Sequence, residues 1–281
     1  MRPKQWTKNL VLFAALLFSR NLFSVRLALL SMAAFVIFAL LSGGVYIFND
    51  LMDMEEDKLH PKKSMRPLSA GLLSPKTARA AFFLAAAAAI GASFFINTKF
   101  AIAALAYLSI QIAYCLFFKN AVILDVFSIA SGFFLRVVAG GAAISVPISP
   151  WLMVCTFFLS LFLSLCKRRH EILLLPAKDA AGHRNVLREY NIALLDQMIT
   201  VVTSGTVLTY AIYTIAEETV RKFHTPNLLY TIPFVLYGVY RYLYLVYHKK
   251  EGGSPEIVLL SDRPMIINII LYAGAVVAIL Y

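Results

Sequence analysis

Residues 49–67 read NDLMDMEEDKLHPKKSMRP and directly follow a long apolar segment. Asp50, Asp53 and Asp57 are separated by three and four residues, and such offsets place side chains on one face of a helix. Asn49 lies beside this row. A carboxylate cluster at the end of a membrane helix is costly without a counter-ion. Hard divalent cations take oxygen ligands, and Mg²⁺ commonly binds with substrate phosphates, so the stretch predicts a metal–diphosphate site.

Basic residues follow the aspartates at once, at Lys58, Lys62, Lys63 and Arg66. They are suited to clamp the phosphates of a ligand whose metal the aspartates hold. A charged loop in solvent is the competing interpretation. The shared helix face and the position at a helix end favour the site.

The bulk properties indicate an integral membrane protein. The chain has 281 residues, 60% of them hydrophobic, and carries repeated apolar runs near twenty residues long. The spans use nearly the whole length, which predicts one membrane domain over residues 1–281. No cleavable signal peptide is expected. The net charge of +11 lies mainly in short connections, which indicates membrane topology and anionic ligands, with no nucleic acid as partner.

The apolar runs predict an all-α polytopic bundle of nine transmembrane helices. Proline and glycine residues punctuate the connections between several of the runs. The first predicted helix is the weakest because its apolar core is short. The expected ranges are 7–23, 27–49, 75–97, 100–118, 122–145, 151–173, 190–216, 227–248 and 264–281.

The connections carry the positive charge unequally. With the N-terminus placed in the cytoplasm, that side holds nineteen Lys or Arg residues and the opposite side five. Positive charge collects on the cytoplasmic side of membrane proteins. We therefore expect a plasma-membrane protein with a cytoplasmic N-terminus, an external C-terminus and a cavity that faces the cytoplasm.

A second candidate site follows the sixth predicted helix, in CKRRHEILLLPAKDAAGHRNVLREY at residues 166–190. Lys167 and Glu171 are four residues apart and share a helix face, and Arg184 belongs to a similar pair with Arg188. Lys167 and Arg168 close an apolar helix and are expected to point into the same vestibule as the aspartates. A cationic anchor that touches only lipid headgroups remains the alternative.

Other polar residues are expected near the same face. Lys8 belongs to the basic N-terminal segment, for which a membrane anchor and a ligand contact are equally supported. Tyr114 and Lys119 end the fourth predicted helix. Asp125 and Arg136 are ionisable residues inside a predicted span, which makes them functional hypotheses by default. For Arg136, structural pairing with a neighbouring helix is an equally good interpretation.

The motif resembles that of a known superfamily. Residues 49–67 fit the NDxxDxxxD…RP pattern of the UbiA superfamily of intramembrane prenyltransferases, and nine helices with the motif after the second fit as well. Within it the chain is most similar to the decaprenyl-phosphate phosphoribosyltransferase branch. The segments that carry this likeness are RPKQWTKN, GGVYIFND, RPLSAG, LDVFSIASGFFLRVVAGG and CKRRHE.

The resemblance implies a function. That branch transfers the 5-phosphoribosyl group from phosphoribosyl diphosphate to a polyprenyl phosphate, toward lipid-linked arabinofuranose for cell-wall glycans. The resemblance also implies Mg²⁺ as the cofactor and membrane lipid as the surroundings of the protein. It is compatible with a homo-oligomer. The metal and diphosphate would be held by Asn49, Asp50, Asp53 and Asp57. The implied catalytic residues are Asp50, Asp53, Asp57 and Arg66, and the implied substrate-binding residues are Lys8, Asn49, Lys62, Tyr114, Lys119, Lys167, Arg168, Glu171 and Arg184.

Two other functions remain open. Aromatic prenyltransferases of the quinone type share the first motif, but they usually carry a second Asp-rich motif after the sixth helix. Here that loop has few acids amid six Lys or Arg residues, which favours a ligand with more negative charge than a prenyl diphosphate. A non-catalytic lipid transporter is the third hypothesis. The cluster at a helix end, rather than at mid-membrane, speaks against it.

Overall fold

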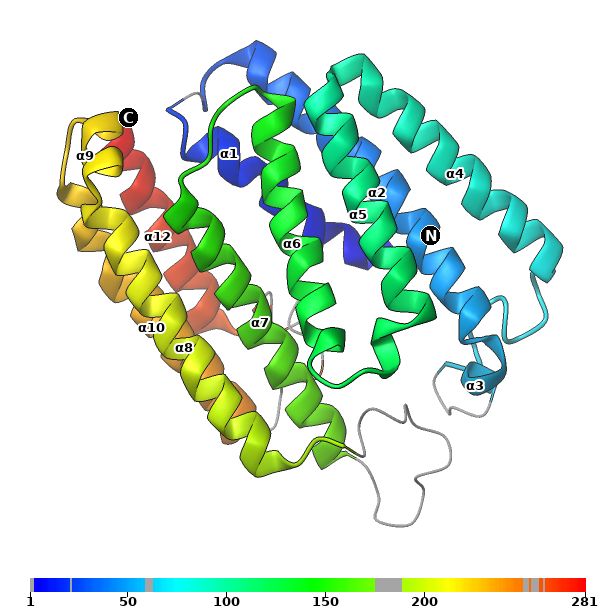
Figure 1. Ribbon diagram of the computed structural model, residues 1–281. Helices are drawn as coiled ribbons and strands as arrows, with labels where there is room; N and C mark the ends of the chain where they lie inside the picture. Colours follow the sequence, from blue (N-terminus) through cyan, green and yellow to red (C-terminus); the bar gives the residue numbers. More distant parts are fainter. Residues whose placement is uncertain are drawn as a thin grey trace.

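The computed structural model describes residues 3–20, 22–58, 63–174, 189–249, 253, 258–259 and 261–281. Within these ranges the chain forms helices and turns, with no strand (Figure 1). The elements are η1 (Pro3–Phe13), α1 (Ala14–Leu17), α2 (Val25–Met52), α3 (Met54–Lys58), α4 (Pro75–Ile96), α5 (Thr98–Leu116), η2 (Phe118–Asn120), α6 (Leu124–Ala143), α7 (Pro150–Leu173), α8 (Ile192–Ile215), α9 (Glu217–Phe223), η5 (Asn227–Thr231), α10 (Ile232–Tyr247) and α12 (Arg263–Leu280).

Seven of the described helices are long and apolar enough to cross a membrane: α2, α4, α5, α6, α7, α8 and α12. The protein is therefore a polytopic, all-α membrane protein, as the sequence predicts. The count of nine spans stays a prediction. The first predicted range corresponds to η1 and α1, and the eighth to η5 and α10; these elements are not among the seven.

Side-chain caps fix several helix starts. The Ser74 hydroxyl accepts a hydrogen bond from the backbone N–H of Thr77 over 3.1 Å, and Pro75 occupies the first turn of α4. The Asn97 side chain caps α5 in the same way, accepting from the N–H of Phe100 over 2.8 Å. Such caps satisfy N–H groups that the first turn leaves without partners. They explain why the predicted and observed starts of these helices agree within about two residues.

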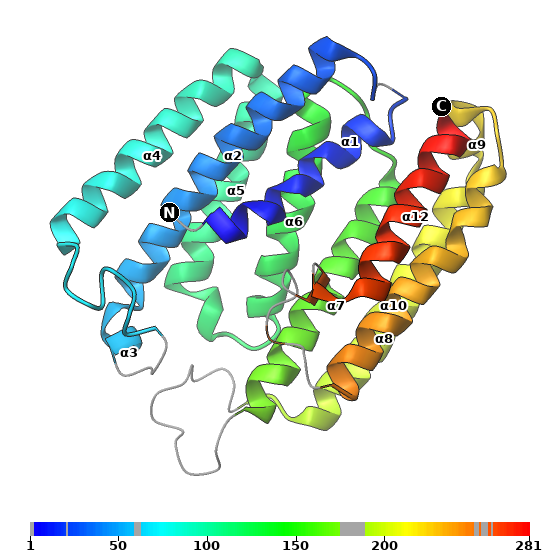
Figure 2. The same cartoon turned by 180° about the vertical axis from the view of Figure 1, so that it is seen from behind.

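The helices pack mainly against their neighbours along the chain. α2 lies against α4, α5 against α6, α6 against α7, and α7 against α8 (Figure 1). The η1 segment crosses both α2 and α6, as Figure 2 shows from behind. This crossing is close. A Cβ at Gly140 of α6 would lie 2.2 Å from the carbonyl oxygen of Leu12, so the backbones can approach only because residue 140 has no side chain.

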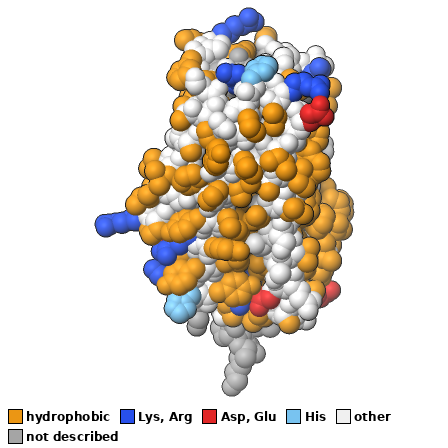
Figure 3. Space-filling view, turned by 90° about the vertical axis from the view of Figure 1, so that its left-hand side faces the viewer, with side chains coloured by type: hydrophobic (Ala, Val, Ile, Leu, Met, Phe, Trp, Pro, Cys, Tyr) orange, Lys and Arg blue, Asp and Glu red, His pale blue; other side chains and the backbone are white. Residues whose placement is uncertain are grey.

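The outside of the bundle is apolar. Phe83, Leu84, Val201, Ile270 and other large hydrophobic side chains are exposed. Figure 3 shows hydrophobic side chains over the middle of one face, with charged ones mostly toward its ends. This is the surface expected of a protein in lipid, where the exterior is as apolar as the core.

Candidate functional site

The aspartate motif lies where α2 passes into α3. α2 ends at Met52, and Asp53 stands at the junction between the two helices. Across this junction the N–H of Asp53 donates to the carbonyl of Asn49 over 2.9 Å, and the N–H of Asp57 to that of Asp53 over 2.8 Å. The four-residue hydrogen-bond spacing of an α-helix therefore continues through the break. Asn49, Asp53 and Asp57 consequently follow one another along one side.

Arg66 joins two of the aspartates. Its Nη1 donates to Oδ1 of Asp50 over 3.1 Å and also to Oδ2 of Asp57. Asp57 is buried, and the Nζ of Lys63 lies 3.9 Å from its other carboxylate oxygen. The described part of the connection between α3 and α4, from residue 63 onward, thus brings two cations to the motif.

Asp53 has different partners. The Nζ of Lys119 lies 2.5 Å from Oδ1 of Asp53, and the side chain of Asn49 donates to its Oδ2 over 2.9 Å. Both Asp53 and Lys119 are buried. The Sγ of Cys115 in turn lies 3.6 Å from the amide oxygen of Asn49. The α5–α6 connection, which contains η2, therefore closes on the motif from the other side.

A second polar cluster lies at the end of α7. The Nε of Arg168 donates to Oδ2 of Asp125 over 2.6 Å, and its Nη1 donates to Glu171. The hydroxyl of Tyr190 donates to the other oxygen of Asp125 over 2.7 Å and accepts from the N–H of Ile123 over 2.7 Å. Burial and the bond to Asp125 raise the pKa of Tyr190, so it remains a donor. Arg168 and Asp125 are buried, and this cluster fixes the end of α7 against α6.

The two clusters meet at the last turn of α5. Lys167 interacts electrostatically with Lys8, Tyr114 and Glu171, and Arg168 interacts with Tyr114 as well. Tyr114 directly precedes Cys115, which contacts Asn49. Figures 1 and 2 show the end of α2 with α3, the α5–α6 connection and the end of α7 at one end of the bundle.

The predicted site residues therefore fall into three groups. The structure brings Asn49, Asp50, Asp53, Asp57, Arg66 and Lys119 into one cluster. It places Lys8, Tyr114, Lys167, Arg168 and Glu171 in a second cluster beside it. Lys62 and Arg184 lie outside the described residues.

The oxygen donors of the motif suit a hard cation such as Mg²⁺. Two of its carboxylates, from Asp50 and Asp57, surround a single cationic nitrogen of Arg66, which stands where a cation between them would lie. Asp53 instead faces Lys119. Across the ranges that the structure describes, no three acidic, His or Cys side chains form a ready-made metal site. Mg²⁺ held by Asn49, Asp50, Asp53 and Asp57 stays a prediction.

The sequence pattern does not indicate every member of these clusters. No sequence pattern marks Tyr190 as part of a site, because a tyrosine before a helix is common and can have many roles. Asp125 stood out as an ionisable residue in a span, but its partner Arg168 is 43 residues away. Arg136 pairs with neutral groups: its Nε donates to the side chain of Asn9 over 2.7 Å and its Nη2 to the hydroxyl of Tyr107 over 2.8 Å.

Fold and site together define a class: a polytopic helical membrane protein with an acidic motif and a cationic cluster side by side at one end of its bundle. The family follows from comparison with known proteins. The model of the UbiA prenyltransferase family matches residues 10–270, and the chain belongs to this family. The membership inferred from the motif is confirmed.

Relatives are similar over nearly their whole length. A protein of Corynebacterium glutamicum named decaprenyl-phosphate phosphoribosyltransferase is 31% identical over 286 residues, covering 100% of this chain and 85% of the relative. A protein of Mycolicibacterium smegmatis with the same name is 30% identical over 292 residues, covering 100% of this chain and 91% of the relative. The resemblance to this branch is thereby confirmed.

Solved structures show the same fold. A UbiA homologue from Archaeoglobus fulgidus, bound to GPP and Mg²⁺, superposes with a TM-score of 0.75 at 21% identity, covering 99% of this chain and 97% of that one. A UbiA homologue from Aeropyrum pernix superposes with a TM-score of 0.72 at 16% identity, covering 99% and 98%. At these identities the likeness is one of fold.

Proposed function

We propose that this protein is a Mg²⁺-dependent glycosyltransferase that moves the 5-phosphoribosyl group from 5-phosphoribosyl 1-diphosphate to a polyprenyl phosphate such as decaprenyl phosphate. The names of its full-length relatives support this choice. The observation that carries it is the convergence of Arg66, Lys119 and the Lys167–Arg168 pair beside one acidic motif.

The charge balance distinguishes the donor. A prenyl diphosphate with an aromatic acceptor brings one phosphate-bearing group to the site. Phosphoribosyl diphosphate adds a 5-phosphate, and a lipid phosphate adds a further anion. Lys8 and Lys167 interact with each other as like charges, with Glu171 as the nearby acid. An anionic ligand between these lysines would relieve that repulsion, which favours the more highly charged pair of substrates.

The aspartates would hold the metal and the diphosphate. Mg²⁺, when bound by Asn49, Asp50, Asp53 and Asp57, supplies Lewis-acid stabilisation of the leaving diphosphate. Arg66 contacts both Asp50 and Asp57. Once released from these carboxylates, its guanidinium is placed to bind a phosphate oxygen in bidentate fashion.

The transfer itself requires little acid–base chemistry. The bond between C1 of the ribose and the diphosphate oxygen breaks, and the diphosphate leaves with the electron pair. An oxygen of the lipid phosphate forms the new bond to C1, which has oxocarbenium character as in other glycosyl transfers. Because the acceptor is already an anion, no general base is needed. The side chains act by positioning and by charge neutralisation, and an in-line attack inverts the anomeric centre.

We further propose the setting of this reaction. The whole chain, residues 1–281, acts as one catalytic domain in the plasma membrane, with its N-terminus and the site in the cytoplasm and its C-terminus outside. The excess of Lys and Arg on the side of the site supports this orientation. The polyprenyl chain would leave the site between helices into the lipid.

A substrate-choice assay tests the proposal. Purified protein with Mg²⁺ receives phosphoribosyl diphosphate with decaprenyl phosphate, or geranyl diphosphate with an aromatic acid, and the lipid products are identified by mass spectrometry. The proposal expects a phosphoribosyl lipid from the first pair only. Prenylated aromatic acid without phosphoribosyl lipid would establish the quinone-type reaction instead. The observation that favours the quinone-type reaction is that solved structures of similar fold are bound to GPP or DMAPP.

A further inference from the structure

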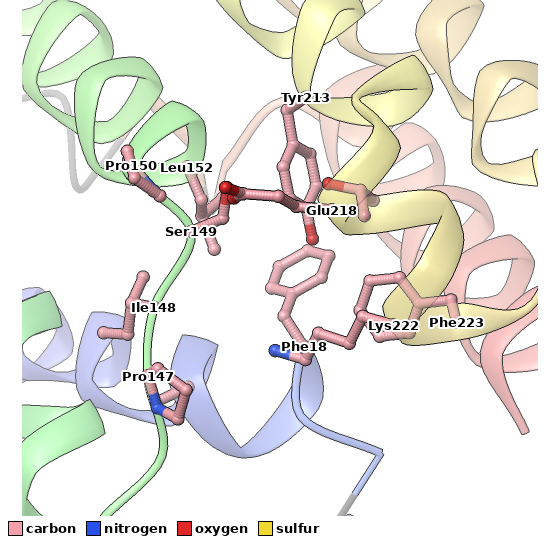
Figure 4. Close-up of a pocket in the computed structure, with 12 residues that line it drawn as sticks. Phe18, Pro147, Ile148, Ser149, Pro150, Leu152, Tyr213, Glu218, Lys222 and Phe223 are labelled. Carbon is pink, nitrogen blue, oxygen red and sulfur yellow. The ribbon is translucent and has the colours of Figure 1, made fainter.

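A pocket lies at the end of the bundle opposite the aspartate motif. It has a volume of about 250 Å³ and is formed by α1, the α6–α7 connection, the end of α8 and α9 (Figure 4). α7 begins at this pocket, and its last turns carry Arg168 and Glu171, so the length of the helix separates the pocket from the candidate active site. Most of its wall is apolar, with aromatic rings from Phe18, Tyr213 and Phe223.

Two hydroxyl groups of residues that line the pocket have no hydrogen-bond partner among the described residues. Thr219 is 2% exposed, and its Oγ1 makes no hydrogen bond within the described residues. The Oγ of Ser149, on the facing connection, is likewise buried and without a partner there. Buried polar groups are almost always hydrogen-bonded, and leaving one unsatisfied is costly. The two hydroxyls are therefore the polar groups of the wall that a ligand in the pocket would have to satisfy.

Two opposite charges flank the cavity without pairing. On α9, Glu217 and Arg221 are four residues apart and form an ion pair of 2.6 Å on the exposed side. Glu218 and Lys222 have the same spacing, but no ion pair joins them. Figure 4 shows Glu218 extending toward Ser149 and Lys222 extending across the pocket. Glu218 and Lys222 are exposed residues at the rim of the pocket, and partial burial lowers the pKa of Lys222.

We propose that this pocket binds the headgroup of a zwitterionic phospholipid that carries a primary ammonium and a phosphate. Lys222 binds the phosphate, Glu218 binds the ammonium, and the hydroxyls of Ser149 and Thr219 bind the remaining headgroup oxygens. The apolar wall accommodates the beginning of the acyl chains. The position fits a lipid, because the start of α7 and the end of α8 are the ends of two candidate membrane spans, where a span meets the headgroup layer.

A lipid with only negative charge fits less well. Its phosphate would satisfy Lys222 but would leave Glu218 facing an anion across the same cavity. A zwitterion satisfies both charges and keeps the pocket neutral. Free phosphoethanolamine carries the same ammonium and phosphate groups, but it lacks the acyl chains that the apolar wall would contact.

Lipid binding to the purified full-length protein tests the proposal by native mass spectrometry. The probes are phosphatidylethanolamine, phosphatidylglycerol with the same acyl chains, and water-soluble phosphoethanolamine. We expect phosphatidylethanolamine to bind at least about 10-fold more tightly than either of the others. Lys222→Gln and Glu218→Gln should each weaken its binding about 10-fold, since each removes a charged hydrogen bond, and Thr219→Val about 3-fold.

Arg221→Gln is the matched control, because Arg221 belongs to the same helix and pairs away from the pocket. Its lipid affinity should stay within twofold of the wild type. Equal binding of the two phospholipids, equal binding of free phosphoethanolamine, or unchanged affinity in folded Lys222→Gln and Glu218→Gln would each overturn the proposal. If a variant does not fold, as judged by thermal melting, the proposal is tested by the lipid selectivity of the wild type alone. The phosphoribosyl-transfer assay does not enter this test.

Discussion

Replacing Arg168 with methionine should destabilise the protein strongly. The side chains of Arg168 and Asp125 are 3% and 0% exposed, and their N–O distance is 2.6 Å. With charge centres about 4 Å apart and an effective dielectric constant near 20, their attraction is about 4 kcal/mol. Removal of one partner leaves the other charge buried and unpaired, which costs about 3 to 5 kcal/mol. We expect Arg168→Met to lower the free energy of unfolding by this amount.

The next residue on α7 provides a matched control. The Nε of Arg169 also donates to a carboxylate, that of Asp196, over 2.6 Å. The Asp196 side chain is 35% exposed, and a partly exposed ion pair contributes at most about 1 kcal/mol. Arg169 also lies 4.0 Å from the ring centroid of Tyr247, which adds up to about 1 kcal/mol. Arg169→Met should therefore cost about 1 to 2 kcal/mol.

The assay is reversible unfolding in mixed micelles with increasing sodium dodecyl sulfate, followed by circular dichroism. A double variant, Asp125→Asn with Arg168→Met, should be more stable than Arg168→Met alone because the buried carboxylate is neutralised. Equal losses for Arg168→Met and Arg169→Met would refute the reasoning, since the two bonds have the same length and differ mainly in burial.

Three further predictions concern packing, pH and catalysis. Gly140→Ala should lower the free energy of unfolding by about 3 kcal/mol, because a Cβ there meets a backbone carbonyl at 2.2 Å. Gly91 lies in open space, so Gly91→Ala should be neutral or stabilising by up to about 1 kcal/mol in the same unfolding assay. The hydrogen bond from Arg241 lowers the pKa of Asp262, so its carboxylate stabilises the folded state above the ordinary Asp pKa, near 4, and loses this effect as pH falls through the lowered value. The thermal stability of the wild type should therefore exceed that of Asp262→Asn at pH 7, and the difference should shrink as the pH falls below about 4; a difference that is constant with pH would contradict this. Lys119→Met should reduce phosphoribosyl transfer at least about 100-fold, since it leaves a motif carboxylate buried without its cation, and Lys119→Arg should recover part of the activity in the same product assay.

The helices were predictable because their signals are local. α4 and α5 combine apolar runs with Ser74 and Asn97 caps, and their observed bounds differ from the predicted ranges by at most two residues. The second expected range ends at residue 49, whereas α2 continues to Met52 and passes into α3 at Asp53. The backbone keeps the helical hydrogen-bond spacing across this junction, so apolar periodicity alone does not fix where the helix ends.

The pairing of charges was not predictable from spacing. Arg66 was expected to bind phosphate, but nothing local indicates that one of its nitrogens contacts both Asp50 and Asp57. Asn9 and Arg136 are 127 residues apart in the chain and meet only because η1 crosses α6. Such contacts depend on how distant helices are placed, and a single sequence carries no direct record of that placement.

The most direct test of the proposed site is donor binding measured by isothermal titration calorimetry. Purified protein is titrated with phosphoribosyl diphosphate, with and without Mg²⁺, and then with geranyl diphosphate. We expect Mg²⁺-dependent binding of phosphoribosyl diphosphate, at least about 10-fold tighter than that of geranyl diphosphate, and its loss in Asp50→Asn and Asp57→Asn. Binding that is unchanged by chelation of the metal, or a preference for geranyl diphosphate, would contradict it.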